Sequence, residues 1–213
     1  MLRSVAQHVA GSEQAPKTAR GASTRERLLR AAESVFAEHG YSGTRIADIV
    51  HAAGVSHGNF YRHFQNKDDV FVAVLEPLLD ELVEPFVRAL AESSDALESM
   101  VRVNTDFFAT YARHRRLFPL LREAAAVNPD FTAMWLRMRD RFVGRIAAWL
   151  DEIGATPPGA AADPPLLAQA LGAMTEQLAY TQIGKSPHLP RPETIAELGR
   201  IAGTVWHRSI RRE

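Results

Sequence analysis

The sequence contains no cysteine, and this absence excludes several kinds of site at once. Without thiols the chain cannot form a disulfide framework, a thiolate zinc site or a cysteine nucleophile. It also lacks any apolar run near the ~20 residues that a membrane-spanning helix needs, and its N-terminus lacks the apolar core of a signal peptide. We therefore expect a cytoplasmic protein with no membrane partner.

The chain also has no net charge, because 25 basic residues are balanced by 25 acidic ones. A neutral chain does not coat nucleic acid nonspecifically, although a local basic face remains open. Hydrophobic residues account for 46% of the 213 residues, so the chain can bury a full hydrophobic core and is long enough for two domains. This composition is typical of an ordinary globular protein.

The motifs of common catalytic and nucleotide-binding sites are also absent. The chain has no G-x-S-x-G, no P-loop, no G-x-G-x-x-G after a strand and no H-E-x-x-H. Its histidines do not fall at metal-ligand spacing, since His57 and His63, for example, lie on one short predicted helix and would point in different directions. We therefore predict a protein that is not an enzyme and that uses neither a metal nor a cofactor.

One stretch, TRIADIVHAAGVSHGNFYRHF at residues 44–64, carries the most information. Apolar residues recur at helical spacing in its first half, and Gly54 closes that helix because glycine adopts the left-handed conformation of a sharp turn. Ser56 is a good N-cap for a second helix. That helix turns Phe60 and Phe64 inward and shows small polar groups near its N-terminus, which suits the DNA major groove. The pattern predicts a helix-turn-helix.

Residues 24–75 also carry a set of residues at fixed spacing. These are Phe36, Gly40, Tyr41, Thr44, Asp48, Ile49, Ala53, Gly54, Val55, Ser56, Gly58, Phe60, Tyr61, His63, Phe64, Asn66, Lys67, Asp68 and Val70. On these residues the segment resembles the DNA-binding domain of the tetracycline-repressor (TetR) family of bacterial transcription regulators. Two positions depart from the family pattern, Val50 in place of alanine and His57 in place of lysine or arginine. The second change weakens one expected phosphate or base contact.

Within this motif we assign ten residues to DNA binding. They are Thr44, Arg45, Ser56, His57, Gly58, Asn59, Tyr61, Arg62, His63 and Lys67. Thr44 is expected to cap the first helix of the motif, and Asn59 can pair with adenine in bidentate fashion, worth ~1–3 kcal/mol of discrimination. The cationic and phenolic side chains are expected to contact the phosphates that set the register. The alternative is a solvated polar face, and His63 could instead be a packed, hydrogen-bonded histidine.

No strand or hairpin pattern stands out, and the chain is predicted to be all-α with about nine helices. Residues 1–22 show little periodicity and read as a flexible N-terminal arm, which is either without a role or touches DNA through Arg3, Lys17 or Arg20. Residues 23–70 form the three-helix DNA-binding domain, and residues 71–213 form a helical effector-binding and dimerisation domain. Asn66 caps a long helix, which is expected to kink or break at Pro77 or Pro85. Further helices are predicted over residues 95–114, 117–127, 129–153, 165–183 and from Pro192 onward.

Aromatic and methionine side chains line the middle helices, with a few polar groups among them. The candidate pocket residues are Asn104, Phe107, Phe108, Tyr111, Met134, Trp135, Met138, Met174 and Gln177. Such a stripe is either plain core or the wall of a small-molecule pocket, and the family resemblance implies a pocket. The expected ligand is a small hydrophobic molecule with one or two polar groups. A cationic ligand would instead need acidic wall residues, for which Glu123 and Glu176 are candidates.

A single helix-turn-helix covers few base pairs, so useful affinity needs two copies one DNA turn (~34–36 Å), or a multiple of it, apart on a near-palindrome. The last two predicted helices carry more apolar residues than one small core needs. The candidate interface residues are Leu171, Leu178, Leu198, Ile201, Val205 and Trp206. The family resemblance implies that these helices pair into an intermolecular four-helix bundle; the alternative is that they fill an intrachain core.

Together these patterns predict a homodimeric DNA-binding transcription regulator. The expected mode is a repressor that leaves a palindromic operator when a small hydrophobic ligand binds. A ligand acts only if it prefers one conformation, and we expect it to move the long helix after the motif and change the spacing of the recognition helices. An effector-independent or architectural DNA-binding protein is the alternative, and activation also remains open.

Overall fold

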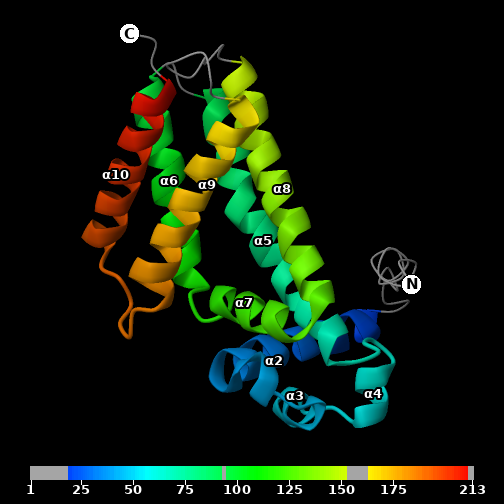
Figure 1. Cartoon of the computed structure of the whole chain (residues 1–213). Helices are drawn as coiled ribbons and strands as arrows, with labels where there is room; N and C mark the ends of the chain where they lie inside the picture. The colour runs from blue at the N-terminus through cyan, green and yellow to red at the C-terminus, as the bar shows by residue number, and fades with distance from the viewer. Residues whose placement is uncertain (1–18, 93–94, 153–162, 211–213) are drawn as a thin grey trace. The chain divides into compact units, whose positions relative to one another are not determined.

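The computed structural model of the chain describes residues 19–92, 95–152 and 163–210 (Figure 1). These residues form nine α-helices and one short π-helix, with no strand among them. The all-α prediction is therefore confirmed for the described part of the chain. Most of the predicted N-terminal arm lies outside the described residues, but residues 19–22 already belong to the first described helix.

The described residues form two units. The first unit holds the described residues up to Pro77 together with Leu120–Thr132, and the second holds Leu78–Pro119 and the described residues from Ala133 onward. Three helices carry residues of both units, namely α5 (Lys67–Glu92), α7 (Phe118–Val127) and α8 (Pro129–Glu152). The first unit therefore includes a short segment that the sequence placed in the effector half.

The first unit is built on α2 (Ala19–Gly43), α3 (Ile46–Ala53), α4 (His57–Tyr61) and the first turns of α5. These helices share a core of fully buried apolar side chains. The core members include Leu28, Ala32, Phe36, Ile49, Phe60, Val70 and Phe71. Because buried residues recur at helical spacing in α2, α3 and α5, the amphipathic pattern of the sequence already indicated which face of these helices would be buried.

Two glycines make the turns of this unit, because their backbones take positive φ values. Gly40 (φ 73°, ψ 173°) interrupts the helical geometry of α2, and Gly54 (φ 60°, ψ 40°) ends α3 in the left-handed conformation. Any other residue would be strained at either position. The helix ends predicted at these glycines are confirmed, although three more residues follow Gly40 in a helical turn.

Asn66 caps α5 as predicted, because its Oδ1 accepts the backbone N–H of Asp69 at 2.8 Å. The expected break at Pro77 or Pro85 is wrong, since α5 is helical along its whole length, whereas the alternative, a kink at either proline, stays a prediction. A proline removes one helical hydrogen bond, and buried apolar side chains on both sides of Pro77 hold the helix in place despite that loss.

The second unit contains α6 (Ala96–Arg113), α9 (Pro164–Ala179), the π-helix η1 (Tyr180–Gly184) and α10 (Pro192–Ile210), with the remainders of α5 and α8. α10 runs along α6 (Figure 1). Gly199 and Gly203 make this contact close: a Cβ built on Gly203 would lie 2.5 Å from the backbone nitrogen of Val101, and one on Gly199 would lie 2.7 Å from the Cα of Thr105. Two helix backbones approach this closely only where side chains are absent.

The predicted helix over residues 165–183 is divided differently in the structure. It is an α-helix as far as Ala179 and continues as η1, in which the N–H of Lys185 donates to the carbonyl of Tyr180 at 2.9 Å. A Cβ built on Gly184 would lie 3.0 Å from the hydroxyl oxygen of Tyr111. This tertiary contact accompanies the wider turn, and apolar periodicity in the sequence carries no sign of it.

The remaining helix boundaries follow the capping residues that the sequence contains. Asp95 caps α6 by accepting the N–H of Leu97 at 2.8 Å, and Pro129 opens α8. The predicted loop over residues 154–163 lies outside the described residues except for Asp163, the N-cap of α9. Among the described helices, none combines the length and the low polarity that crossing a lipid bilayer would require.

Candidate nucleic-acid interface

The turn between α3 and α4 has the predicted geometry. The hydroxyl of Ser56 accepts the backbone N–H of Asn59 at 3.3 Å, so Ser56 is the N-cap of α4. Arg27 on α2 holds the turn from behind, because its Nη2 donates to the carbonyl oxygens of Ala53 at 2.6 Å and of Gly54 at 3.1 Å. Arg27 was not among the predicted site residues, since no local signal in the sequence marks a side chain that binds a turn 26 residues away.

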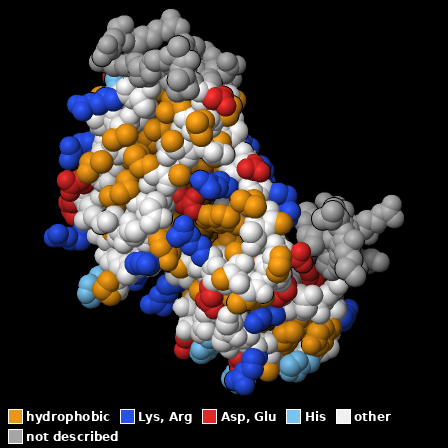
Figure 2. All heavy atoms as spheres, viewed as in Figure 1, with side chains coloured by type: hydrophobic (Ala, Val, Ile, Leu, Met, Phe, Trp, Pro, Cys, Tyr) orange, Lys and Arg blue, Asp and Glu red, His pale blue; other side chains and the backbone are white. Residues whose placement is uncertain are grey.

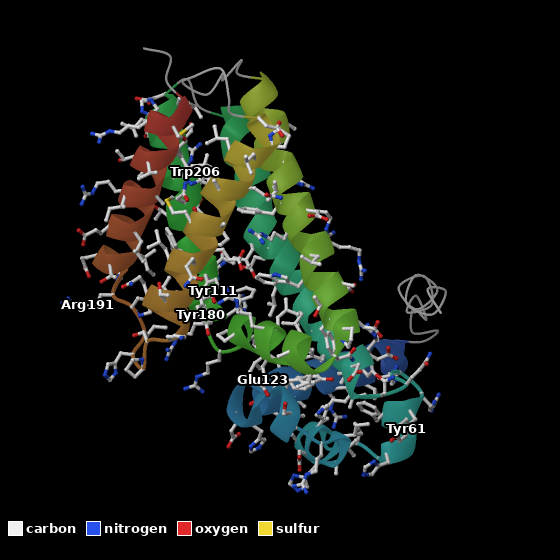
Figure 3. The ribbon with its side chains drawn as sticks, in the orientation of Figure 1. Tyr61, Tyr111, Glu123, Tyr180, Arg191 and Trp206 are labelled. Carbon is white, nitrogen blue, oxygen red and sulfur yellow. The ribbon has the colours of Figure 1, made fainter. Side chains whose placement is uncertain are left out.

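One edge of α4 is polar and open to solvent. His57, Gly58 and Arg62 are exposed, and 57% of Tyr61 is accessible. Figure 3 shows the Tyr61 side chain pointing away from the rest of its unit. The opposite edge is closed: Phe60 is fully buried, with its ring 5.7 Å from that of Phe64. The inward aromatic pair therefore holds α4 with its polar edge outward.

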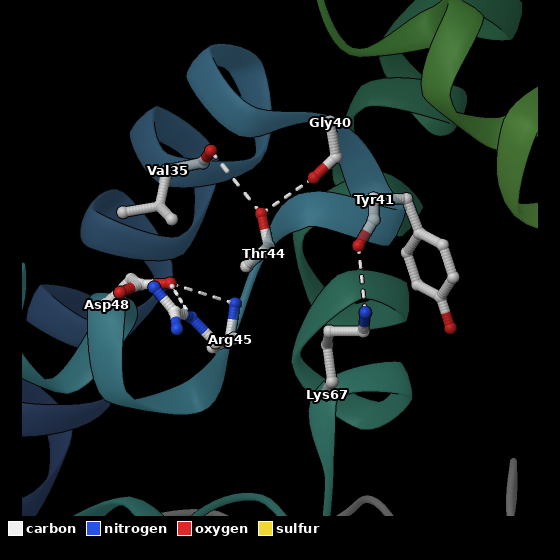
Figure 4. A network of polar contacts seen from close by, with 7 residues as sticks. All are labelled: Val35, Gly40, Tyr41, Thr44, Arg45, Asp48 and Lys67. Carbon is white, nitrogen blue, oxygen red and sulfur yellow. Dashed lines mark hydrogen bonds and ion pairs between the residues drawn. The ribbon is translucent and has the colours of Figure 1, made fainter.

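Arg45, and not Thr44, occupies the N-cap position of α3. Arg45 is the N-cap of α3, and its backbone N–H donates to the Asp48 carboxylate at 3.1 Å, while its side chain stays exposed (Figure 4). Thr44 is only 2% exposed, and its hydroxyl donates to the carbonyl of Gly40 at 2.7 Å. The prediction that Thr44 caps the helix is wrong, because its hydroxyl turns inward and donates to the Gly40 carbonyl, and the N-cap position is taken by Arg45.

The side chain of Lys67 also contacts its own unit instead of extending into solvent. Its Nζ donates to the carbonyl of Tyr41 at 2.8 Å and lies 4.4 Å from the centre of the Tyr41 ring (Figure 4). The Tyr41 hydroxyl in turn donates to Asp68 at 2.5 Å, and burial together with Asp68 raises the pKa of Tyr41. Lys67 thus stabilises the part of the first unit formed by α2, α3, α4 and the first turns of α5, which we call the head, and it also adds positive charge there.

His63 lies at the border of the polar edge and is half-buried. Burial lowers its pKa, and the nearby positive charges of Arg62 and Arg25 lower it further. Arg25 itself sits over the ring of Phe64, 5.3 Å from its centre. His63 is therefore held in its neutral form near pH 7, which suits a hydrogen-bonding side chain better than a fixed cation.

Residues 120–132 pack directly on this head, although the sequence placed them in the effector half. The N–H of Ser42 donates to Oε1 of Glu123 at 2.9 Å, and Nδ2 of Asn128 donates to Oδ2 of Asp68 at 3.0 Å. Phe131 is buried with its ring 5.2 Å from that of Tyr41. These contacts join segments far apart in the sequence, so only the folded chain shows them.

The candidate pocket residues all fall in the second unit, but they are not equally placed. Asn104, Phe107, Phe108 and Tyr111 are buried; Met134, Trp135 and Met174 are half-buried; Gln177 is exposed; the side chain of Met138 lies outside the described residues. The exposed side chain of Gln177 therefore does not belong to the buried group of candidate pocket residues on α6, and Met134, Trp135 and Met174 are intermediate in exposure.

Asn104 does not present an open polar group. Its Nδ2 donates to the carbonyl of Met100 at 2.9 Å, and its Oδ1 accepts the hydroxyl of Thr175 at 3.2 Å. Thr175 in turn accepts the indole N–H of Trp206 at 3.2 Å. The three side chains form a closed network between α6, α9 and α10, which satisfies polar groups that would otherwise be costly to bury.

The candidate dimer residues also divide into two groups. Leu171 and Trp206 are buried within their own chain, so they cannot form a contact surface as predicted. Figure 3 shows Trp206 directed between the helices. Ile201 and Val205 are 46% and 42% exposed, and Figure 2 shows hydrophobic side chains spread over the visible face of α9 and α10. Leu178 and Leu198 are half-buried.

Two protein-family models match the chain. Residues 28–74 match the family described as "Bacterial regulatory proteins, tetR family", and residues 100–211 match "Transcriptional regulator EthR, C-terminal domain". The second match covers more than half of the chain. The two matches fall on the head of the first unit and mostly on helices of the second unit.

Several curated proteins are similar in sequence. The "Probable acrEF/envCD operon repressor" of Escherichia coli K12 is 32% identical over 52% of each chain. The "HTH-type transcriptional repressor KstR2" of Mycolicibacterium smegmatis is 30% identical over 56% of this chain and 60% of its own. The "HTH-type transcriptional regulator EthR" of Mycobacterium tuberculosis is 25% identical over 86% of this chain and 85% of its own. This chain thus spans only about half to three fifths of the length of the first two relatives.

Solved structures give the same architecture at low sequence identity. Salmonella enterica GusR matches with a TM-score of 0.72 and 21% identity, covering 88% of this chain and 95% of its own. A transcriptional regulator from Rhodococcus matches with a TM-score of 0.71 and 24% identity, covering 86% and 96%. At these identities the likeness shows the fold.

Proposed function

This chain belongs to the tetR family of bacterial regulatory proteins, and from that premise we propose that it is a homodimeric repressor released from a palindromic operator by a small hydrophobic effector. The prediction that it is not an enzyme is confirmed by the family. The observation that carries the proposal is the exposed polar edge of α4, held outward by the buried ring of Phe60. A short helix presented in this way fits the major groove.

The residues along this polar edge take different parts in the proposed DNA contact, and Asn59 among them is half-buried. We propose that Asn59, which lies in the first turn of α4, reads a base edge, and that Gly58 beside it leaves room for close approach. Arg45, Tyr61 and Arg62 are proposed to contact phosphates. Thr44 is left out of the contact surface because it is buried, and Lys67 acts mainly by holding Tyr41.

We further propose that two chains pair through the exposed faces of α9 and α10. The proposed interface does not include Leu171 and Trp206, which are buried; it consists chiefly of the exposed apolar residues Ile201 and Val205. Burying such side chains against a second copy gains roughly 25 cal/mol per Å² of apolar surface. A polar rim around them is typical of such an interface.

Ile201→Asp is expected to convert the dimer into monomers, because it would bury an unpaired carboxylate at the centre of the contact. The measurement is the mass of the protein in solution by sedimentation or light scattering. Leu136→Asp is the matched control, since Leu136 is a similarly exposed leucine on α8. An Ile201→Asp variant that stays dimeric, or a Leu136→Asp variant that dissociates, would contradict the proposed interface.

The effector is proposed to bind among the aromatic side chains of the second unit. The rings of Phe107 and Phe142 lie 6.0 Å apart, and those of Tyr111 and Phe118 lie 4.8 Å apart. An aromatic interior with a few polar groups suits a small hydrophobic ligand. The ligand is proposed to favour a conformation in which α5 has moved, which changes the spacing of the two recognition helices.

The test is to let the protein select duplexes from a random pool and then to challenge the selected complex with small hydrophobic compounds. A near-palindrome with half-sites one helical turn (about 34–36 Å) or a multiple of it apart is the expected result. Release by one of the compounds supports the repressor, whereas a complex indifferent to all of them favours an architectural DNA-binding protein. Failure to enrich any duplex would overturn the DNA-binding proposal itself.

A further inference from the structure

The joint between α2 and α3 is the feature on which the helix-turn-helix depends. Gly40, with φ at 73°, interrupts α2, and α3 begins only six residues later, at Ile46. Its carbonyl accepts the hydroxyl of Thr44 at 2.7 Å, which ties the conformation of the joint to the residue just before the N-cap of α3. We call residues 40–44 the Gly40 joint.

Glu123, far along the chain on α7, holds this joint from outside. Its Oε1 accepts the backbone N–H of Ser42 at 2.9 Å. A Cβ built on Gly40 would lie 3.2 Å from its Oε2, so the carboxylate lies against the bare Cα of the glycine. Figure 3 shows Glu123 on α7 beside α2.

The charge of Glu123 is retained in this setting. Partial burial acts to raise the pKa of the carboxyl, but hydrogen bonds from Ser42 and Tyr41 and the positive charge of Lys67 outweigh it and leave the pKa below the usual value of a glutamate. An ionised carboxylate makes a stronger hydrogen bond to a backbone N–H than a neutral acceptor does. The contact is therefore a charge-assisted one at neutral pH.

A second set of hydrogen bonds holds Tyr41, which is also part of the Gly40 joint. Asn128 donates to Asp68, which accepts the hydroxyl of Tyr41, and Lys67 binds the Tyr41 carbonyl. Tyr41 is thus held by its side chain and its backbone, while Ser42 is held by Glu123. The joint consequently has little freedom as long as residues 120–132 stay in place.

We propose that Glu123 is a positioning residue: it fixes the Gly40 joint and so sets the direction in which α3 and α4 present their polar edge to DNA. This inference rests on the proposed function. Glu123 lies on α7, outside the helix-turn-helix segment, and its helix also carries residues of the second unit. A displacement of α7 that withdraws the carboxylate from Ser42 frees the joint and weakens DNA binding.

The experiment compares three variants of the full chain on the duplex that the wild-type protein selects. Glu123→Ala removes the acceptor, and Glu123→Gln keeps an oxygen acceptor without the charge. Glu38→Ala is the matched control, because it removes an exposed carboxylate of α2 that makes none of these contacts. All three lose one negative charge, so long-range effects on phosphate attraction cancel between them.

Relative to Glu38→Ala, we expect Glu123→Ala to bind the duplex about tenfold more weakly and Glu123→Gln to stay within about threefold. The amide hydrogen of Ser42 should exchange faster in Glu123→Ala alone. Binding is measured at a temperature where every variant is fully folded, so that a stability change does not imitate a positioning effect.

Two results would overturn the inference. One is a Glu123→Ala variant that binds as tightly as Glu38→Ala although its Ser42 amide exchanges faster. The other is a Glu123→Gln variant as weak as Glu123→Ala, because the acceptor oxygen is then present without effect. A wild-type protein that selects no duplex would count against the proposed function instead, so the two failures are distinguishable.

Discussion

Gly203→Ala should lower the free energy of unfolding by about 3 kcal/mol, because a methyl group there overpacks a helix contact that has no room for it. The new Cβ would lie 2.5 Å from the nitrogen and 2.6 Å from the Cα of Val101. Both are backbone atoms of α6, so a side-chain rotation cannot relieve the clash and α10 has to move away. Chemical denaturation followed by circular dichroism measures the loss.

Gly144→Ala is the matched control for this prediction. Gly144 lies in α8, is exposed, and has no atom within 4 Å of a Cβ built on it. Alanine is better than glycine in a helix interior by about 0.5–1 kcal/mol, so this variant should be slightly more stable than the wild type. Equal stability of the two variants would show that the close approach of α10 to α6 is not as tight as described.

Asn59→Ala is expected to remove the preference for particular base pairs, at a cost of about 1–3 kcal/mol on the preferred sequence. Asn59 is in the first turn of α4, where base edges come within reach of a helix in the major groove. Its loss should leave affinity for unrelated duplexes nearly unchanged. The measurement is repeated selection from a random pool, with binding constants for the winning and losing sequences.

Arg62→Ala is the companion variant and should behave oppositely. Arg62 is exposed at the C-cap of α4, so its removal should weaken all sequences alike and reduce the slope of log affinity against log salt by about one. If Asn59→Ala leaves base preference intact, α4 is not the reading helix. Lys67→Ala is less suited to this comparison, since it would also release Tyr41.

The local parts of the DNA-binding head could be predicted because each depends on neighbours in the sequence. Ser56 and Asn66 cap their helices with their own side chains, and Gly40 and Gly54 interrupt them by their backbone freedom. Phe60 is on the buried face of α4, and Phe64 follows the end of that helix, where its N–H donates to the Phe60 carbonyl at 2.9 Å and brings it to the same inner side. For these residues the interactions that fix the cap, the turn or the inward orientation all lie within a few positions along the sequence.

Residues with more than one suitable partner could not be assigned in this way. Trp206 and Ile201 are both apolar and both on α10, but only the packing of α6 and α9 decides that Trp206 is covered while Ile201 is exposed. Thr44 and Lys67 carry groups that suit phosphate, yet the folded chain offers them carbonyl oxygens at Gly40 and Tyr41. For Trp206 and Lys67 the competing partner is distant in the sequence, whereas for Thr44 it is only four residues away, at the interruption that Gly40 makes in α2.

By itself, the sequence determined the helical class, the helix-turn-helix with its caps and turns, and the family, because these follow from spacing and capping within a few turns of chain. Only the tertiary structure decided that α7 reaches back to the Gly40 joint through Glu123, and that α10 packs on α6 at two glycines. Such contacts join residues about 80 to 100 positions apart. Local propensity does not encode them, since they form only when burial of the whole core brings distant segments together.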